Sequence, residues 1–294
     1  MNGRLSVKIL LTGAGGQVGR AFRTLAPAQA TVVALTHADL DITDAAELQR
    51  AVVTHAPQWI VNAAAYTAVD AAEGAQAAAH ALNASAVGYL AQAAKRAHAR
   101  LVHLSTDFVF DGRASNPYEP DALTAPIGVY GATKLAGEQQ ALADDAPSIV
   151  VRTSWVYAAY GQNFVRTMLR LMAAKPELRV VCDQIGSPTW ASGLAQVLWK
   201  MIEIDAPAGI HHWCDAGVAS WYDFAVAIQE EALQRGILTQ AIPVLPIRAA
   251  QYPTPAKRPA YSVLESARTR ALTGAAATHW RVQLRKMLDE LATA

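Results

Sequence analysis

The sequence contains little that would point to a secreted, membrane-bound or metal-binding protein. Its 294 residues include only two cysteines, Cys182 and Cys214, which form no C-x-x-C pair and no spacing typical of metal ligands. Two cysteines in a chain of this length indicate reduced, structural thiols and hence a cytoplasmic protein. No apolar run approaches the roughly 18 residues that a membrane span requires. The first residues lead directly into a glycine-rich loop, with no signal-peptide cleavage site. We therefore expect a soluble cytoplasmic protein that binds no membrane.

The sequence also lacks an excess of charge of either sign. Lys and Arg number 25 and Asp and Glu number 24, which gives a net charge of +1. This balance argues against a nucleic-acid surface and against an anchor for anionic lipid. The length allows one large domain or two modest ones. The hydrophobic content of 52%, much of it Ala, is typical of helices packed closely on a sheet.

A strand, a glycine turn and a helix are expected at the start of the chain. Val7–Leu11 is a short apolar run rich in β-formers, and Thr12–Gly19 and the helix-favouring Arg20–Ala26 follow it. This order is the context of a dinucleotide-binding loop, in which backbone approaches the pyrophosphate closely and a helix N-terminus faces the charge. The glycine spacing differs from the G-x-G-x-x-G of simple dehydrogenases, and an ordinary glycine turn is the alternative. Cofactor binding is favoured, with candidate residues Gly13, Gly16, Gln17, Val18 and Gly19.

The end of the second predicted strand, Thr31–Leu35, bears on the choice between NADPH and NADH. An NAD-specific dehydrogenase usually has an acid there, which accepts a hydrogen bond from the ribose 2′-hydroxyl. Here Thr36 and His37 follow the strand, and either could lie beside a 2′-phosphate, so NADPH is slightly favoured. A solvated loop histidine is an equal alternative for His37. Asp41 and Ile42 are candidates for contact with the adenine, just before a predicted helix at 45–55 that Thr43 or Asp44 would cap.

The next two predicted strands end in small residues and in hydroxyl groups. The strand at 57–62 is followed by five candidate cofactor contacts, where a flat ligand could lie against the backbone: Ala63, Ala64, Ala65, Tyr66 and Thr67. The strand at 101–104 ends in Leu104, a further candidate, and delivers Ser105, Thr106 and Asp107. The hydroxyls of Ser105 and Thr106 could bond a substrate carbonyl oxygen. A helix-rich stretch, 71–99, lies between them. Its Asn83 has either a structural or a proton-relay role.

Tyr130 and Lys134 form a potential acid–base pair. They are four residues apart in a predicted helix and therefore lie on one face. A phenol titrates near pH ~10, and a nearby ammonium favours its ionised form, so Lys134 is expected to lower the pKa of Tyr130. The spacing alone occurs by chance in many proteins, and a surface helix is the alternative. The specific signal is the ordered set of glycine loop, small-residue loop, strand-end hydroxyls and Tyr–Lys pair.

With these motifs in place, the chain resembles the extended short-chain dehydrogenase/reductase superfamily, and within it the family of dTDP-4-dehydrorhamnose reductases. The resemblance covers essentially the whole chain, and the segments around Trp155 and Arg258 are specific to that branch. It is carried by residues 62–70, 105–110, 129–138, 152–157 and 252–259.

The resemblance implies that NADPH or NADH reduces the C4 keto group of dTDP-4-dehydro-L-rhamnose to give dTDP-L-rhamnose, the last step of dTDP-rhamnose biosynthesis. The implied catalytic residues are Thr106, Tyr130 and Lys134, of which Tyr130 and Lys134 also contact the cofactor. The implied substrate-binding residues are Thr106, Asp107, Trp155 and Arg258. The residues themselves support the last of these, because Arg258 gives the Pro-rich passage 243–259 a cationic tip suited to a diphosphate. A solvated basic loop is the alternative.

Two other functions remain open. Another nucleotide-sugar reductase or epimerase would share every cofactor feature. A non-catalytic relative, such as the regulatory subunit of methionine adenosyltransferase, can lose the Tyr–Lys pair. Dehydratases of the superfamily commonly carry Asp-Glu after the Ser/Thr position, whereas Phe108 follows Asp107 here, which argues against dehydration.

No metal is expected. Some members of the family dimerise through a metal held by carboxylates in the first helix and after the Gly-x-Pro-Thr loop. The corresponding stretches here, 20–23 and 190–192, contain no acid, so we expect a monomer or a weak homodimer. His211 and His212 are adjacent in a predicted strand and face opposite sides of it, which makes them a poor metal pair.

The expected fold is an α/β doubly wound parallel sheet of the Rossmann type, with a smaller C-terminal substrate-binding lobe. The dinucleotide-binding domain is predicted at 1–157, with a returning segment at about 191–216. The nucleotide-sugar lobe is predicted at 158–190 and 217–294. The second half is expected to contain strands at 149–153, 179–183 and 209–214, and helices at 163–174, 191–204, 221–235 and 279–294.

Overall fold

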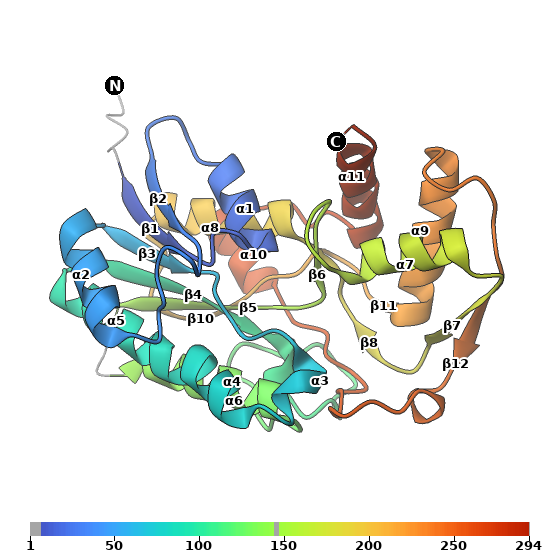
Figure 1. Cartoon of the computed structure of the whole chain (residues 1–294), viewed down its shortest axis with the longest axis horizontal. Coiled ribbons are helices and arrows are strands. Elements are labelled where there is room, and N and C mark those ends of the chain that lie inside the picture. The colour runs from blue at the N-terminus through green and yellow to red at the C-terminus, as the bar shows by residue number, and fades with distance from the viewer. Residues whose placement is uncertain (1–6, 144–146, 294) are drawn as a thin grey trace.

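The computed structural model describes residues 7–143 and 147–293 and is built around one six-stranded parallel sheet (Figure 1). The strand order is β10-β5-β4-β3-β1-β2. The chain therefore begins with β1 inside the sheet and continues to β2 at one edge. It then crosses to β3 on the other side of β1, and β4, β5 and β10 follow in order toward the opposite edge. This reversal is the hallmark of a doubly wound fold, and the predicted fold class is confirmed. The strands are β1 (Lys8–Thr12), β2 (Thr31–Leu35), β3 (Trp59–Asn62), β4 (Arg100–Thr106), β5 (Ser148–Thr153) and β10 (Gly209–His212).

Helices cover both faces of this sheet, so its strands are apolar on both sides (Figure 1). Side chains alternate along a strand. In β1, Ile9 and Leu11 therefore join the core under α1 (Gln17–Thr24) and α8 (Ala191–Glu203), whereas Leu10 joins the opposite core. That opposite core lies under α2 (Ala45–His55), α5 (Ala86–Arg96) and α6 (Val129–Ala141).

The helix-rich stretch before β4 forms two helical pieces separated at residues 73–75, contrary to the single element that its composition suggests. It contains α3 (Val69–Ala72), α4 (Gln76–His80) and a π-helical turn (Ala81–Ser85) that leads into α5. Asn83 lies in this turn. Its side chain accepts from Tyr66 N at 2.8 Å and donates to Tyr66 O and to Thr133 Oγ1, both at 3.1 Å. Of the two roles open for Asn83, these contacts support the structural one, because they tie the loop after β3 to α6.

A second core lies beside the sheet, at the right of Figure 1. It packs α7 (Phe164–Ala174), α9 (Trp221–Gln234) and α11 (Trp280–Ala292) against the parallel pair β7 (Leu178–Val181) and β12 (Val244–Ile247). β12 and a 3₁₀ turn (Ala249–Gln251) both lie inside the Pro-rich passage. The remaining elements are β6 (Val156–Tyr157), β8 (Ile185–Gly186), β9 (Thr189–Trp190), β11 (Ala219–Ser220) and α10 (Ala267–Thr273).

Local capping fixes where several helices begin. Asp44, not Thr43, caps α2, because its side chain accepts from Ala46 N and Glu47 N. Ser220 and Asp223 form a reciprocal capping box at the start of α9. This box sets the position of the first residue of α9, which faces the cleft described below.

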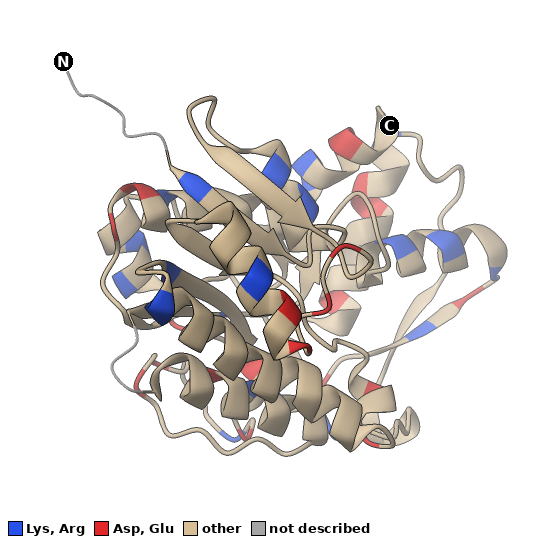
Figure 2. Ribbon diagram, turned by 60° about the vertical axis from the view of Figure 1, so that its left-hand side comes forward, with Lys and Arg blue, Asp and Glu red and all other residues tan. Residues whose placement is uncertain are grey.

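Basic and acidic residues are interspersed along the ribbon in the view of Figure 2. Within residues 7–143 and 147–293, no helix is long and apolar enough to cross a membrane, and no three His, Cys, Asp or Glu side chains gather as a potential metal site.

Candidate active site

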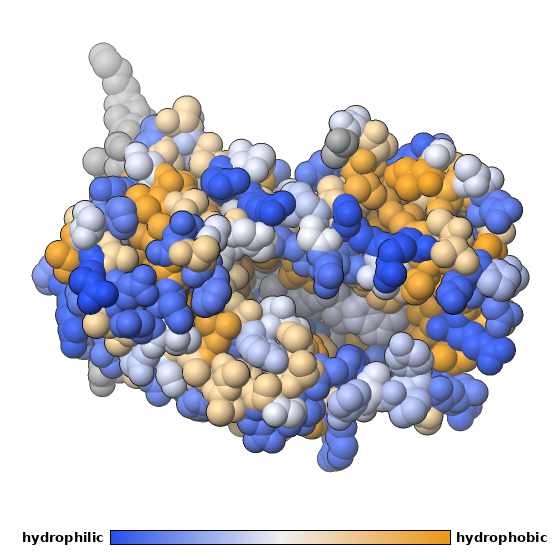
Figure 3. Space-filling view, in the orientation of Figure 1, coloured by the Kyte–Doolittle hydropathy of each residue, from blue (hydrophilic) through white to orange (hydrophobic). Residues whose placement is uncertain are grey.

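A cleft of about 610 Å³ lies at the carboxyl ends of the central strands, between the sheet and the second core. Figure 3 shows the molecule hollowed between these two parts. This edge of an open α/β sheet is where such folds bind ligands. Many of the residues predicted from the sequence line the cleft: Gly16, Gln17, Val18, Ala63, Ala65, Thr67, Leu104, Thr106, Asp107, Tyr130, Lys134, Trp155 and Arg258.

Gly13 and Gly19 shape the glycine loop without lining the cleft. Gly13 has a φ of +69°, and a Cβ there would lie 2.5 Å from the backbone carbon of Ala63. A Cβ at Gly19 would lie 2.3 Å from Gly13 O. Both positions therefore need glycine so that the loop can pack on the strand ends.

The first turn of α1 has the properties of a phosphate site. Its N-cap residue is Gly16, and no side chain caps the helix. The unpaired N–H groups and the helix dipole thus face the cleft that Gly16 and Gln17 line. The residues present therefore fit the diphosphate of a dinucleotide cofactor.

The end of β2 lies beside this loop but outside the cleft lining. A Cβ at Gly15 would lie 3.8 Å from Thr36 Cγ2, which makes Thr36 a neighbour of the phosphate site. Thr36 donates from N and Oγ1 to Asp39 Oδ2, at 2.9 and 2.6 Å. A carboxylate is therefore present four residues beyond the strand, although none was predicted there. His37 is exposed.

Four other predicted cofactor residues also lie outside the lining. Asp41 accepts hydrogen bonds from Thr43 N and Oγ1, and Ile42 is buried in the core below the sheet. Ala64 donates from its backbone to Asn62, and the backbone of Tyr66 is held by Asn83. The backbone contacts of Ala64 and Tyr66 thus fix the loop after β3.

Close packing by two glycines brings α6 to the strand ends. A Cβ at Gly131 would lie 2.2 Å from Phe108 O, and one at Gly137 would lie 2.0 Å from Asn83 O. The helix can approach the turn after β4 and the π-helical turn at 81–85 closely only because both side chains are missing. As a result Tyr130 and Lys134 face the same cleft as Thr106.

Tyr130 is held as a protonated phenol. Burial raises its pKa to about 12, a hydrogen bond with Thr106 opposes this rise, and the charge of Asp107 adds to it. The pKa of Tyr130 is therefore raised overall, whereas a lowered pKa was predicted, because burial dominates. Burial also raises the pKa of Asp107 to about 6, although the hydrogen bonds of Ser262 and Thr106 oppose it.

Lys134 is buried and points past Tyr130 toward β4. Its Nζ donates to Leu104 O at 2.6 Å and lies 3.3 Å from His103 Nε2. Burial lowers its pKa to about 8, while the charge of Glu138 acts in the opposite direction. The ammonium and the neutral amine are therefore both accessible near neutral pH.

Two tryptophans form the opposite wall of the cleft. Trp155 stacks on Trp221, the first residue of α9, with centroids 3.5 Å apart and planes at 5°. A Cβ at Gly186 would lie 2.6 Å from Trp155 Cε2, so this backbone also packs against the indole. Trp155 has a φ of +46°, which side chains rarely allow and which occurs where surrounding structure enforces it. Trp155 is thus a rigid wall.

Arg258 reaches the cleft from the Pro-rich passage and is anchored to the first half of the chain. Its Nη1 and Nη2 donate to the two oxygens of Asp70, at 3.0 and 2.7 Å, in a bidentate pair. Nη1 also contacts Thr254 Oγ1 at 2.6 Å. The hydrogen bond from Arg258 keeps the pKa of Asp70 below its usual range, despite burial.

Several residues of the site were not predicted as functional. Trp221 and Gln162 line the cleft from the second core, and His103 lies behind Lys134. A signal for His103 was present, since it is a polar residue in the middle of a buried strand, where a partner is required. An aromatic at a helix start, such as Trp221, carries no comparable signal because core packing explains it equally well.

The sequence model of the RmlD substrate binding domain matches residues 7–293. The dTDP-4-dehydrorhamnose reductase of Aggregatibacter actinomycetemcomitans is 40% identical, over 95% of this chain and 98% of its own. A probable dTDP-4,6-dihydroxy-2-methyloxan-3-one 4-ketoreductase of Streptomyces antibioticus is 43% identical, over 97% and 96%. The crystal structure of the dTDP-4-dehydrorhamnose reductase of Bacillus anthracis in complex with NADP superposes with a TM-score of 0.90 at 34% identity, covering 97% of this chain and 100% of that one.

Proposed function

The chain belongs to the RmlD substrate-binding-domain family, and on that premise we propose that it reduces the C4 keto group of dTDP-4-dehydro-L-rhamnose with NADPH or NADH to give dTDP-L-rhamnose. The observation that carries the proposal is the meeting of Thr106, Tyr130 and Lys134 in one cleft with the glycine loop. Several relatives at about 40% identity are named as this reductase, which supports the same substrate. A regulatory function gains no support, because the acid–base groups are in place.

Reduction needs a hydride and a proton, and a bound nicotinamide supplies the hydride. Tyr130 supplies the proton to the developing C4 alkoxide. A phenol whose pKa is about 12 is almost fully protonated at neutral pH, so the proton donor is loaded before the substrate arrives. Thr106 Oγ1 bonds the carbonyl oxygen and stabilises the charge that develops there. Lys134 holds the nicotinamide ribose and, as an ammonium, favours the phenolate that Tyr130 becomes.

The nucleotide-sugar is bound by the parts of the cleft that face the sheet. We assign residues 1–157 and about 191–216 to the dinucleotide-binding domain, and 158–190 and 217–294 to the lobe that binds the nucleotide-sugar. Trp155 lies against the nucleotide-sugar, Asp107 holds the sugar, and Arg258 binds the diphosphate. The bidentate contact with Asp70 supports the role of Arg258, because it fixes the guanidinium at the cleft edge.

Both nicotinamide cofactors are proposed to serve, with NADPH slightly favoured. The support is that Thr36 and His37 flank the phosphate site without a carboxylate of their own, and that the Bacillus anthracis structure contains NADP. Asp39 acts in the other direction, because its hydrogen bonds with Thr36 keep its pKa low and hence its charge present. Asp39→Asn should therefore raise the ratio of kcat/KM for NADPH over NADH. An unchanged ratio would show that Asp39 does not face the 2′ position.

A second candidate substrate has a specific observation behind it. The Streptomyces antibioticus relative, named for a different dTDP-linked 4-ketosugar, is as similar to this chain as the rhamnose-pathway relatives are. The cofactor machinery would serve either substrate equally. Comparing kcat/KM for the two 4-ketosugars decides between them, and a preference for the second would replace the substrate while keeping the chemistry.

The experiment that tests the function follows cofactor absorbance. Purified protein is supplied with dTDP-4-dehydro-L-rhamnose made in situ by a 3,5-epimerase, and loss of NADPH and of NADH is recorded separately. Tyr130→Phe should reduce kcat by roughly 10²–10⁴-fold, the usual contribution of a general acid. Tyr89→Phe, a half-buried tyrosine on α5, is the matched control and should keep full activity. If the wild-type protein oxidises neither cofactor with verified substrate, the proposal is wrong.

A further inference from the structure

A chain of buried polar groups runs behind the cleft from β1 to Lys134. Thr12 Oγ1 donates to Asn62 Oδ1 at 2.8 Å, Asn62 Nδ2 lies 3.0 Å from His103 Nδ1, and His103 Nε2 lies 3.3 Å from Lys134 Nζ. These four side chains are at most 2% exposed. The position of each hydrogen atom in this row of polar groups is therefore determined by neighbouring protein groups and not by bulk water.

The orientation of the Asn62 amide is fixed by a backbone group. Ala64 N–H, which can only donate, points at Asn62 Oδ1 at 3.1 Å. That atom must therefore be the amide oxygen, and the NH₂ group must face His103 Nδ1. An N–H on Nδ1 would meet another N–H at 3.0 Å, so Nδ1 has to accept.

It follows that the ring proton of neutral His103 is on Nε2, facing Lys134. Protonation of both nitrogens is opposed as well, because burial and the neighbouring Lys134 hold the pKa of His103 well below its usual value. An ammonium has three donors and no acceptor, whereas a neutral amine has a lone pair. The Nε2–H group can thus make a hydrogen bond with Lys134 only when Lys134 has lost a proton.

We propose that His103 is a positioning residue for Lys134: locked by Asn62 with its proton on Nε2, it stabilises the neutral amine that Lys134 becomes when it gives up a proton. This inference rests on the proposed function, in which each reduction removes one proton from Tyr130. In restoring it, the Lys134 N–H bond breaks, the Tyr130 O–H bond reforms, and water later returns a proton to the amine. His103 stabilises the neutral amine of Lys134 between these two proton transfers.

The charged groups around Lys134 do not replace this role. Glu138, one turn along α6, favours the ammonium and is itself paired with Arg152 on β5. Asp107, at the end of β4, faces Tyr130. Both carboxyl groups stabilise positive charge, so His103 is the neighbouring group whose hydrogen bonding favours the neutral form.

The tautomer can be measured directly on the wild-type protein without any substrate. Long-range ¹H–¹⁵N correlation spectra of protein labelled with ¹⁵N-histidine distinguish the two neutral tautomers, and His103→Gln identifies the His103 signals. We expect a neutral ring protonated at Nε2. A ring protonated at Nδ1, or at both nitrogens near pH 7, would overturn the inference. This result does not depend on activity, so it stands apart from the proposed function.

The consequence for Lys134 is tested by the pH dependence of kcat. Because the neutral amine cannot donate a proton, kcat should fall as the pH rises through the Lys134 pKa of about 8. Asn62→Asp places a carboxylate oxygen opposite Nδ1, which draws the ring proton to that side and leaves Nε2 as an acceptor for the ammonium. The basic limb should then move upward by about one pH unit, the size expected for one charge-assisted hydrogen bond.

A purely structural role gives a different result. If His103 only fills space, Asn62→Asp and His103→Leu would lower kcat by the same factor at every pH and leave the limb in place, which would refute the inference. His103→Leu removes the donor to the amine and should also move the limb upward, so either variant suffices if the other does not fold. His55→Gln, a substitution on α2, is the control and should leave the profile unchanged.

Discussion

Glu138 and Glu231 are both buried carboxylates bound by arginine, but they lie on different sides of the cleft and in different surroundings. Glu138 on α6 is paired with Arg152 Nε and Nη2 at 2.9 and 2.7 Å, and Ser105 Oγ donates to it at 2.5 Å. Both charged side chains are 2% exposed. Arg152 uses its third nitrogen on Pro120 O and His212. One guanidinium and one hydroxyl group thus bind this carboxylate away from solvent.

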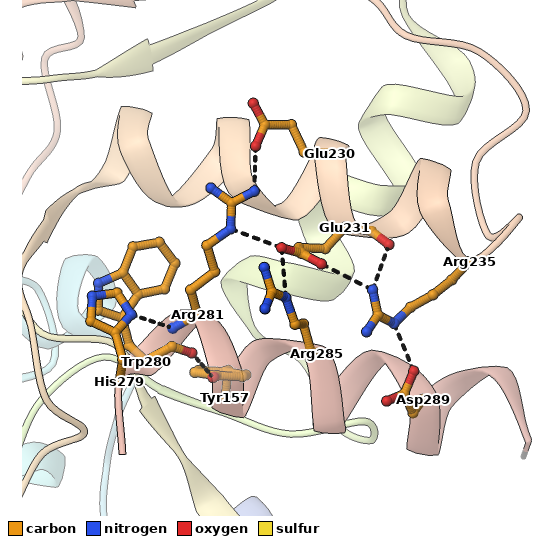
Figure 4. Close-up of polar contacts among 9 residues, drawn as sticks. All are labelled: Tyr157, Glu230, Glu231, Arg235, His279, Trp280, Arg281, Arg285 and Asp289. Carbon is orange, nitrogen blue, oxygen red and sulfur yellow. Dashed lines mark hydrogen bonds and ion pairs between the residues drawn. The ribbon is translucent and has the colours of Figure 1, made fainter. Parts of the chain in front are cut away.

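Glu231 instead has three arginine partners, which Figure 4 shows between α9 and α11. Arg281 Nε, Arg285 Nε and Arg235 Nη1 lie at 2.8, 2.9 and 3.0 Å from its oxygens. The carboxylate has no exposed side-chain surface, but the three arginines are 34%, 47% and 18% exposed. The charge at Glu231 is therefore shared among several partners that water can reach.

The difference concerns what is left behind when one partner is lost. A buried charge without a partner is costly, whereas a charge that retains other partners or solvent is not. The first arrangement holds the helix of Tyr130 and Lys134 in a single position. The second only fastens two helices of the lobe together. We therefore expect the loss of one arginine partner to lower the free energy of unfolding strongly at Glu138. At Glu231 the cost should increase with the number of arginines removed.

The largest effect is expected for Arg152→Met. It leaves Glu138 as a buried, unpaired carboxylate, so the free energy of unfolding should fall by about 3–5 kcal/mol. Denaturant unfolding of both proteins measures the change. The double variant Glu138→Leu with Arg152→Met leaves no charge and should recover part of the loss. A cost below about 1 kcal/mol for Arg152→Met would show that water reaches Glu138 and that the contrast with Glu231 is false.

A smaller effect is expected for Glu231→Gln. The three arginines lose a charged acceptor but remain partly hydrated, so the free energy of unfolding should fall by roughly 1–3 kcal/mol, the range for hydrogen bonds to charged groups. Reductase activity should be unchanged, because none of the three arginines paired with Glu231 lines the cleft. A loss of activity in folded protein would show that the α9–α11 contact also positions the cleft.

The pH dependence of stability should distinguish Glu231 from its Gln variant. Burial raises the pKa of Glu231, but the hydrogen bonds from Arg281 and Arg285 outweigh it, so the net pKa lies below the usual 4.5. A carboxyl with a lowered pKa stabilises the fold above its unfolded-state pKa, and that contribution is lost as the pH falls through the folded-state pKa. The stability difference between wild type and Glu231→Gln should thus be constant above about pH 5 and shrink below pH 4.5. A difference that stays constant down to pH 3 would contradict the assignment.

Local patterns in the sequence were sufficient for most of the fold. The strand at 31–35 and the helix at 45–55 occur at their predicted bounds, because apolar runs and caps are signals within a few residues. The π-helical turn at 81–85 was not predictable in the same way. It depends on the bonds from Asn83 to Tyr66 and Thr133, and an Ala-rich sequence shows no trace of such tertiary contacts.

The candidate site likewise has a part that local patterns predicted and a part that depends on distant residues. The sequence predicted which chemical groups meet, since Thr106, Tyr130 and Lys134 all line one cleft. Spacing within a helix, however, says only that Tyr130 and Lys134 share a face. The groups that Lys134 contacts, Leu104 O and His103, lie on a different element about thirty positions away. Long-range burial, not local spacing, therefore decides the pKa of both groups.

The smallest effect is expected for Arg285→Met, which tests whether the partners of Glu231 are redundant. Arg285 is half-exposed and Glu231 keeps Arg281 and Arg235, so the loss of stability should stay below about 1 kcal/mol. Arg281→Met should behave similarly. The double variant leaves Glu231 with Arg235 alone, and its cost should exceed the sum of the two single costs because the substitutions share a partner. Denaturant unfolding of the four proteins gives this coupling energy. Simple additivity would mean that each arginine acts independently, and that Glu231, like Glu138, has no reserve of partners.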